Sequence, residues 1–165
     1  MDSGWVQAWG SIGAILVGFV YVALQNHHAT KLEQQRQREY AQFIAYLASD
    51  LERHFDAAWT TFDTACRTGG AVKPINGGLL AQTVCNELLT VSPTDCGSAH
   101  FTQLARKIAL FGQAFVAVAR DGSADNQDIR PEIVRQLGEH LKVIKESVPP
   151  LRSIAGLQAD QSNAS

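Results

Sequence analysis

The sequence contains none of the short motifs that mark common enzyme active sites. It has no Walker-type phosphate loop, no HExxH zinc motif, no GxSxG nucleophile elbow and no DxD-type run of carboxylates. Its three cysteines form no CxxC pair, which argues against a zinc knuckle or a disulfide framework and favours reduced thiols. We therefore expect no enzymatic activity, no metal ion and no cofactor.

Neither a strong net charge nor a strand pattern is present. The formal charge of −2 provides no electrostatic attraction to duplex nucleic acid, so we expect no such partner. No segment alternates between polar and apolar residues in the manner of a half-buried strand. Glycine and proline are both missing from residues 19–68. The sequence therefore predicts an all-α protein with one long helix near the N-terminus.

Charged residues are also missing from the N-terminal segment, between Asp2 and Lys31. Residues 6–24 are mostly apolar and span about 28 Å as a helix, close to the ~30 Å hydrocarbon core of a bilayer. Two tryptophans and a tyrosine lie towards the ends of this segment, where aromatic rings favour the headgroup region. These features predict a transmembrane helix. A fully buried helix of a soluble domain is the alternative interpretation.

A cleaved signal peptide fits the N-terminus less well, because "MDSGW" lacks a basic residue and "ALQNHHAT" is a poor cleavage site. Basic residues follow the apolar segment at Lys31, Arg36 and Arg38, and none precedes it. By the positive-inside rule, the N-terminus faces the periplasm and residues 31–165 lie in the cytoplasm. The expected location is the bacterial inner membrane.

One face of the predicted anchor carries small and polar residues at helical spacing. Gly10, Ala14 and Gly18 recur every four residues, a pattern that lets helices approach closely. The same face holds four further residues, Gln7, Ser11, Tyr21 and Gln25. This face predicts contact between copies of the chain. It fits either simple homo-oligomer packing or a narrow pore ringed by at least four copies, with Gln7 and Ser11 wet.

The remaining chain divides into a polar stalk and a helical domain. We expect residues 1–28 to form the periplasmic N-terminus and transmembrane helix, and residues 29–40 a helical stalk. Residues 41–157 form a cytoplasmic four-helix bundle, and residues 158–165 a disordered tail. The fold expected is thus one transmembrane helix that continues into this bundle.

The helices of the bundle follow from apolar periodicity. An apolar stripe runs from Tyr40 to Cys66, and a glycine-rich segment at 67–78 then breaks the helix. Further helices are predicted over 79–91, from residue 101 onward, and up to the prolines at 149–150. We expect Gly122 to cap the third helix, Asp128 to begin the last one, and Pro149 and Pro150 to end it. Glycines 112 and 138 lie inside helical patterns and predict close helix–helix contact.

Basic residues on the last two long helices are candidates for binding an anionic ligand such as a nucleotide. These are Arg106, Lys107, Arg135, Lys142 and Lys145. The competing interpretation is ordinary helix-surface ion pairing, since glutamates lie three or four residues away at 132, 139 and 146. The loop with Arg67 and Lys73 lacks P-loop spacing and is a weaker phosphate candidate. His54 lies one helical turn from Asp50 and is interpreted as a residue at the core edge.

The opening "GWVQAWGSIGAILVGFVYVAL", followed by a polar helix, resembles the N-terminal anchor of small single-pass membrane proteins of bacteria. A short anchor on a cytosolic helical domain also resembles, in architecture, transmembrane effectors of nucleotide-signalled antiphage systems of the CBASS or Hailong type. The resemblance implies a membrane effector, oligomeric and channel-like, gated by a nucleotide or oligonucleotide that a partner enzyme supplies. The alternatives are a bitopic adaptor without pore activity and, third, a membrane-bound enzyme.

Overall fold

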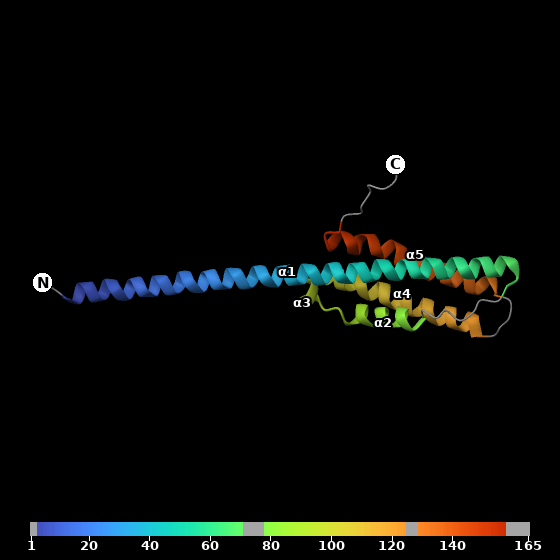
Figure 1. The fold of residues 1–165 in the computed structure, drawn as a ribbon, viewed down its shortest axis with the longest axis horizontal. Coiled ribbons are helices and arrows are strands. Elements are labelled where there is room, and N and C mark those ends of the chain that lie inside the picture. Colours follow the sequence, from blue (N-terminus) through green and yellow to red (C-terminus); the bar gives the residue numbers. More distant parts are fainter. Residues whose placement is uncertain (1–2, 71–77, 125–128, 158–165) are drawn as a thin grey trace, which may run out of the picture. The chain divides into compact units, whose positions relative to one another are not determined.

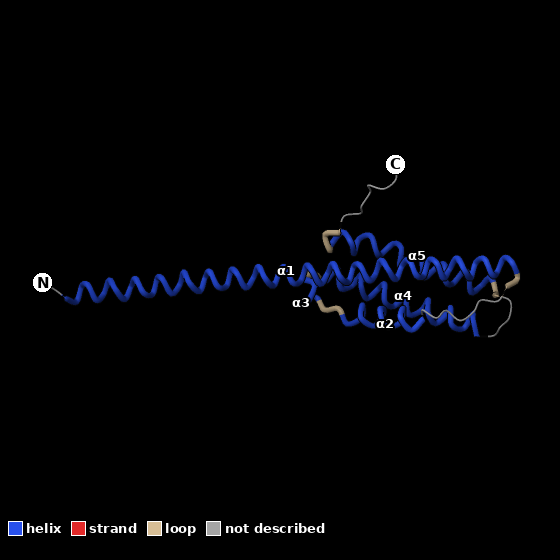
Figure 2. Tube along the Cα trace, in the orientation of Figure 1, coloured by secondary structure: helices blue, strands red, loops and turns tan. Residues whose placement is uncertain are grey.

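The protein is all-helical throughout the part of the chain that the computed structural model describes (Figures 1 and 2). The described residues are 3–70, 78–124 and 129–157, and the side chains of 3–24, 26, 27 and 124 are excluded from the description. The predicted all-α class is confirmed. The predicted tail, residues 158–165, lies outside the described residues.

The first helix, α1, extends from Ser3 to Thr68 without a break. Its length follows from the absence of glycine and proline over residues 19–68, because no residue there removes a backbone hydrogen bond or favours a turn. The helix ends where Gly69 adopts a positive φ of 69°, and the Gly70 amide donates to the Ala65 carbonyl at 2.9 Å. Glycine suits this position because the left-handed backbone conformation is strained for residues with a Cβ.

No helix among the described residues is long and apolar enough to span a membrane. The side chains of the predicted anchor segment, residues 6–24, lie outside those that the structure describes. The prediction of a transmembrane helix therefore stays a prediction.

The chain divides into two compact units at the boundary between Gln37 and Arg38. Most of the described side chains of the first unit are polar and exposed. Leu32 is apolar, and it is also exposed, with 68% of its surface accessible. Gln37 donates a hydrogen bond to Glu33 one turn earlier, at 3.4 Å. This part of α1 thus has the surface of a solvated helix.

The second unit, residues 38–165, adds four helices to the C-terminal part of α1. These are α2 (Gly78–Thr90), α3 (Pro93–Cys96), α4 (Ala99–Ala124) and α5 (Pro131–Ile154). The Ser92 side chain caps α3 by accepting from the Thr94 amide, and Gly97 ends it with a φ of 66°. The sequence predicted helices over 79–91 and from residue 101 onward, and none between them.

Three predicted boundaries are wrong. Gly122 does not cap a helix but lies inside α4, where an added Cβ would meet Ile133 Cγ2 at 2.9 Å. Because Gly122 has no side chain, Ile133 of α5 can lie close to its backbone, and α4 continues past it to Ala124. Arg130 occupies the N-cap position of α5, while the expected cap Asp128 lies outside the described residues.

The third incorrect boundary is the end of the last helix, because α5 continues through Pro149 and Pro150 to Ile154. Each proline removes one backbone hydrogen-bond donor from the helix. The turn that follows nevertheless buries Leu151 and Ala155 completely or nearly so, at 0% and 2% exposure. Burial of these apolar groups offsets the lost hydrogen bonds, so the helix extends one turn beyond the prolines.

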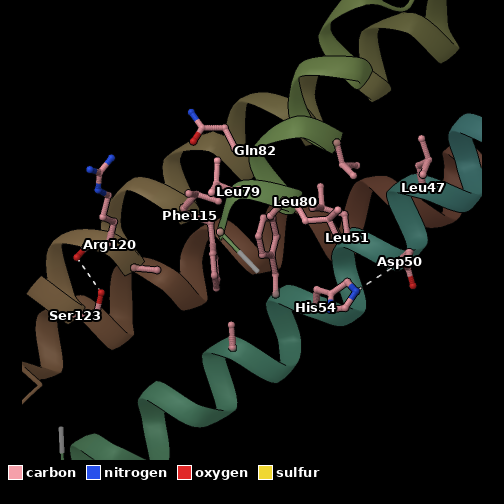
Figure 3. A pocket seen from close by; sticks show the side chains of 17 residues that line it. Leu47, Asp50, Leu51, His54, Leu79, Leu80, Gln82, Phe115, Arg120 and Ser123 are labelled. Carbon is pink, nitrogen blue, oxygen red and sulfur yellow. Dashed lines mark hydrogen bonds and ion pairs between the residues drawn. The ribbon is translucent and has the colours of Figure 1, made fainter. Parts of the chain in front are cut away.

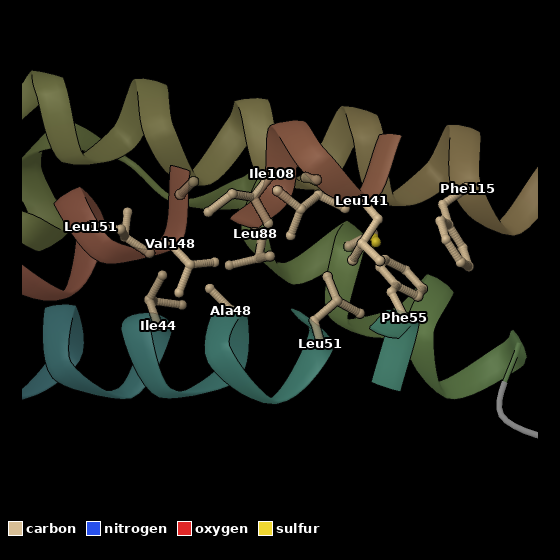
Figure 4. Close-up of a cluster of buried hydrophobic side chains, with 14 of the residues drawn as sticks. Ile44, Ala48, Leu51, Phe55, Leu88, Ile108, Phe115, Leu141, Val148 and Leu151 are labelled. Carbon is tan, nitrogen blue, oxygen red and sulfur yellow. The ribbon is translucent and has the colours of Figure 1, made fainter. Parts of the chain in front are cut away.

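A single apolar core lies between the C-terminal part of α1 and helices α2, α4 and α5 (Figure 4). α1 contributes Ile44, Leu51 and Phe55, which face side chains such as Leu88 of α2 and Leu141 of α5. The rings of Phe55 and Phe115 stack with centroids 4.3 Å apart and planes inclined by 22°. Most of the predicted apolar stripe of α1 therefore packs on the core, but Phe43, which belongs to the predicted stripe, is exposed at 56%.

Glycines inside the helices allow the close packing that the sequence predicted. A Cβ on Gly112 of α4 would lie 2.6 Å from Cys85 Sγ and 3.2 Å from Phe55 Cε2. A Cβ on Gly138 of α5 would lie 3.1 Å from Trp59 Nε1, which donates to the Val134 carbonyl at 3.2 Å. Both glycines lie where a side chain of another helix approaches the backbone.

Candidate functional site

The second unit contains a cavity of about 580 Å³ between α1, α2 and α4 (Figure 3). Its wall is mainly apolar, with Leu51 and Phe55 from α1, Leu80 from α2 and Phe115 from α4 among the lining residues. Cavities of about 300 to 1,000 Å³ with apolar walls and a few polar groups are typical of small-molecule sites. This cavity is the candidate functional site.

The cavity exists because α2 covers only part of the α1–α4 surface. Cys85 and Leu88, in the second half of α2, are completely buried against the core. Leu79 and Leu80, at the start of the same helix, are 83% and 64% exposed, although they line the cavity. The two leucines thus leave apolar surface in contact with solvent, which is costly unless something covers it.

Few polar side chains line the cavity, and four of them form two pairs. In the first pair, Asp50 Oδ2 and His54 Nε2 of α1 lie 3.7 Å apart. Arg120 and Ser123 belong to α4, and the Ser123 hydroxyl donates to the Arg120 carbonyl at 3.0 Å. Figure 3 shows these two pairs at different ends of the cavity. The His54 side chain is exposed at 64% and lies at the rim of the cavity.

The five predicted ligand-binding cations are distributed over several surfaces of the second unit. Arg135 pairs with Glu132 and, at 2.9 Å, with Glu139, all on the exposed face of α5. Lys145 pairs with Asp56 of α1. Both cations therefore already have carboxylate partners, as the helix-surface interpretation of these residues expects.

Arg106, another of the five, donates from Nη2 to the Val91 carbonyl at 3.5 Å, towards the segment that joins α2 and α3. The two remaining cations, Lys107 and Lys142, are exposed and form no ion pair within the described residues. Arg106 contacts Val91, whereas Lys145 contacts Asp56 of α1, so the structure does not gather the five cations into one binding site. None of them lines the cavity.

The residues predicted to form an oligomer or pore face lie in the first unit. Of these, Gln25 is the one with a described side chain, and it is exposed. The phosphate candidate Lys73 lies outside the described residues, and so do the side chains of the other six members of this face, Gln7, Gly10, Ser11, Ala14, Gly18 and Tyr21. Their assignment to a pore or to simple packing thus stays a prediction.

Burial shifts the pKa of several groups near the core without creating a reactive centre. Removal from water raises the pKa values of the Cys85 and Cys96 thiols to about 11, with Asp95 adding to the effect at Cys96. Such thiols are protonated at neutral pH and are poor nucleophiles. Burial also raises the pKa of Glu52, although the nearby ammonium of Lys145 opposes this rise. Over the described residues, no three His, Cys, Asp or Glu side chains cluster as metal ligands would.

The cavity was not predicted from the sequence, although part of its signal is present there. The apolar residues at 47, 51, 55 and 58 recur on one face of α1, and this periodicity predicted burial, not an open wall. The adjacent leucines at the start of α2 gave no indication that they remain exposed, because exposure depends on where α2 sits on α1 and α4. No protein-family model, curated protein or solved structure matches this chain.

Proposed function

We propose that this protein is an oligomeric effector of the bacterial inner membrane, channel-like in activity and controlled by a ligand or partner. In this proposal, residues 6–24 form a transmembrane helix with the N-terminus in the periplasm. The C-terminal part of α1 and helices α2, α4 and α5 form a cytoplasmic four-helix bundle, which receives the signal. The chain performs no catalytic step.

One observation supports the proposal most directly. The uncharged segment and the core-packing residues Ile44, Leu51 and Phe55 belong to one helix, α1, with no glycine or proline after residue 18. In this proposal, a shift of α1 within the bundle passes along its hydrogen-bonded backbone towards residues 6–24. Binding that alters the packing of α1 in the bundle would then move the small-residue face of the anchor.

The small-residue face supplies the second part of the argument. Gly10, Ala14 and Gly18 permit close contact between copies of the anchor, and Gln7 and Ser11 on the same face avoid lipid by facing other helices or water. One helix per chain requires several copies to enclose a pore, and we propose four or more. By fold-level analogy with transmembrane effectors of nucleotide-signalled systems, the same architecture favours a role in antiphage defence, with a nucleotide as a candidate ligand.

Membrane potential in living bacteria tests this function. The full chain is expressed, with and without phage infection, and potential is followed with a voltage-sensitive dye. We expect depolarisation with the native chain and none with Ala14→Leu or Gly18→Leu, because the larger side chains block close helix contact. Ala23→Leu adds the same bulk on the opposite face and should depolarise like the native chain.

Two outcomes would contradict the proposal. If all four chains leave the potential unchanged under every condition, the protein is better explained as a bitopic adaptor that localises its helical unit. If Ala23→Leu abolishes depolarisation as fully as the two small-face variants do, the effect does not come from the small face.

A further inference from the structure

We propose that the cavity between α1, α2 and α4 binds an anionic amphiphile, an alkyl chain that ends in a carboxylate or a comparable anionic head. The chain would lie against Leu51, Phe55 and Phe115, and the head would lie at Arg120. This inference deepens the proposed function, on which its meaning as a trigger rests. Binding itself is measurable whether or not the protein depolarises a membrane.

The walls of the cavity favour an alkyl chain over a polar ligand. Leucine, phenylalanine, valine and alanine side chains from three helices make up most of the lining, and they include Phe55 and Phe115, whose rings stack. A nucleotide base and ribose would place many hydrogen-bonding groups against these walls without partners, so this cavity does not fit the nucleotide that the analogy with nucleotide-signalled effectors suggests. An alkyl chain needs no hydrogen-bonding partners.

The exposed leucines give the ligand a physical reason to bind. Leu79 and Leu80 line the cavity and are also among the most exposed large apolar residues of the described chain. A chain that enters the cavity would remove its own methylene groups and these leucine surfaces from water together. Each buried methylene is expected to tighten binding about fourfold, from the transfer free energy of a CH₂ group.

The charges around the cavity select the sign of the head group. Arg120 is exposed and has no carboxylate partner among the described residues, whereas Arg135 and Lys145 are paired. At the other end of the cavity, the carboxylate of Asp50 would repel an anion and is itself paired with His54. An anionic head therefore fits the end with Arg120 and Ser123, where the guanidinium offers several donors.

Photo-crosslinking of the full chain in native membranes tests the proposal. The probe is a long-chain fatty acid that carries a diazirine on its alkyl chain, and labelled residues are located by mass spectrometry of peptides. We expect labelling of the cavity segments 47–58, 79–84 and 115–123. Excess decanoate should compete with this labelling, and butyrate, which has the same head without the chain, should not.

Matched variants separate the cavity from the surrounding surface. Ala58→Trp fills the cavity and should lower labelling at least tenfold, whereas Ala57→Trp, on the exposed neighbouring position, should label like the native chain. If Ala58→Trp fails to fold by circular dichroism, Val116→Trp fills the same space from α4. The loss of cavity labelling with either folded variant supports the proposal.

A second pair of variants tests the head group. Arg120→Gln should weaken competition by decanoate about two- to fivefold, the effect of losing one exposed ion pair, and should leave competition by decanol unchanged. Lys107→Gln removes an exposed cation of the same helix outside the cavity and should change neither. Competition by a lysophospholipid of equal chain length identifies a lipid source of the anion, and its absence identifies a free carboxylate.

Labelling confined to residues 6–24, or cavity labelling that Ala58→Trp and Ala57→Trp affect equally, would overturn the proposal. These results are distinguishable from failure of the proposed function. Depolarisation without cavity labelling would leave the membrane effector intact and remove this ligand. Cavity labelling in a chain that never depolarises membranes would leave a ligand-binding protein without channel-like activity.

Discussion

Replacement of Gly112 by alanine tests the packing of α1, α2 and α4 around the cavity. The new Cβ would lie 2.6 Å from Cys85 Sγ and 3.2 Å from Phe55 Cε2. Cys85 is completely buried, and its short side chain can move the sulfur only a little. Overpacking of this kind costs about 1–3 kcal/mol of folding stability.

The cost is partly offset by helix propensity. Alanine is more favourable than glycine inside a helix by about 1 kcal/mol. The two effects leave a net destabilisation of about 0–2 kcal/mol, and a central value of about 1 kcal/mol lowers the urea midpoint by about 0.5 M for a typical slope. The measurement is urea unfolding of the full chain in lipid nanodiscs, followed by circular dichroism.

A double-mutant cycle with Cys85→Ala isolates the predicted contact. In the Cys85→Ala background the sulfur is missing, so Gly112→Ala should be neutral or stabilising, with a coupling free energy of about 0.5–3 kcal/mol between the two sites. If Gly112→Ala instead stabilises the native chain by the full helix-propensity difference and shows no coupling to position 85, α2 and α4 do not pack as described.

Three further substitutions and one modification extend the test to other parts of the second unit. Pro149→Ala should stabilise by about 1 kcal/mol or more, because it restores a helix N–H on an exposed position of α5; a destabilised variant would contradict the continuous helix. Trp59→Phe should cost about 0.5–1.5 kcal/mol through loss of the bond to the Val134 carbonyl, and an unchanged urea midpoint would argue against that bond. The folded state raises the pKa of Glu52, so the folded chain holds this proton more tightly than the unfolded chain does. The ionised carboxylate therefore reduces folding stability at neutral pH, and this loss of stability disappears as pH falls below the ordinary pKa of Glu. Glu52→Gln should therefore be more stable at pH 7, with the advantage shrinking in acid unfolding curves, and a pH-independent difference would refute this reasoning. Iodoacetamide should modify Cys85 and Cys96 slowly at pH 8 and rapidly after denaturation, as measured by mass spectrometry; equal rates would contradict their protonated state.

Periodicity predicted the helices well because each one buries a continuous apolar face. The expected helix over 79–91 corresponds to α2 at Gly78–Thr90, and the stripe that includes Ile44 and Leu51 is the core face of α1. Gly112 and Gly138 were correctly predicted as contact points, because an interior glycine is costly unless a neighbour needs its space.

Local rules failed where packing between distant segments decides the structure. Glycine is a common helix cap, so a cap was predicted at Gly122. Ile133 and Phe62 instead approach its backbone, and α4 continues past it. Pro149 and Pro150 would end an isolated helix, but burial of Leu151 holds the last turn on the core. Neither contact is visible from the residues next to these positions in the sequence.

The candidate site shows the same limit. The cations predicted to hold an anion include Arg135 and Lys145, which the fold pairs with carboxylates. Arg120 is not among them, because its position beside the cavity depends on how three helices pack. A cavity arises from the mismatch of three helices, so no single helix carries a pattern that predicts it.

Extraction of bacterial membranes with alkaline carbonate tests the central claim most directly, namely that residues 6–24 of α1 lie in the bilayer. This treatment strips peripheral proteins and leaves chains held by a transmembrane helix in the pellet, because the apolar segment stays in lipid. The account predicts that the full chain remains in the pellet, with proteolysis of spheroplasts leaving the helical unit protected. Release of the intact chain into the supernatant would contradict the anchor, the oligomer and the proposed effector function together.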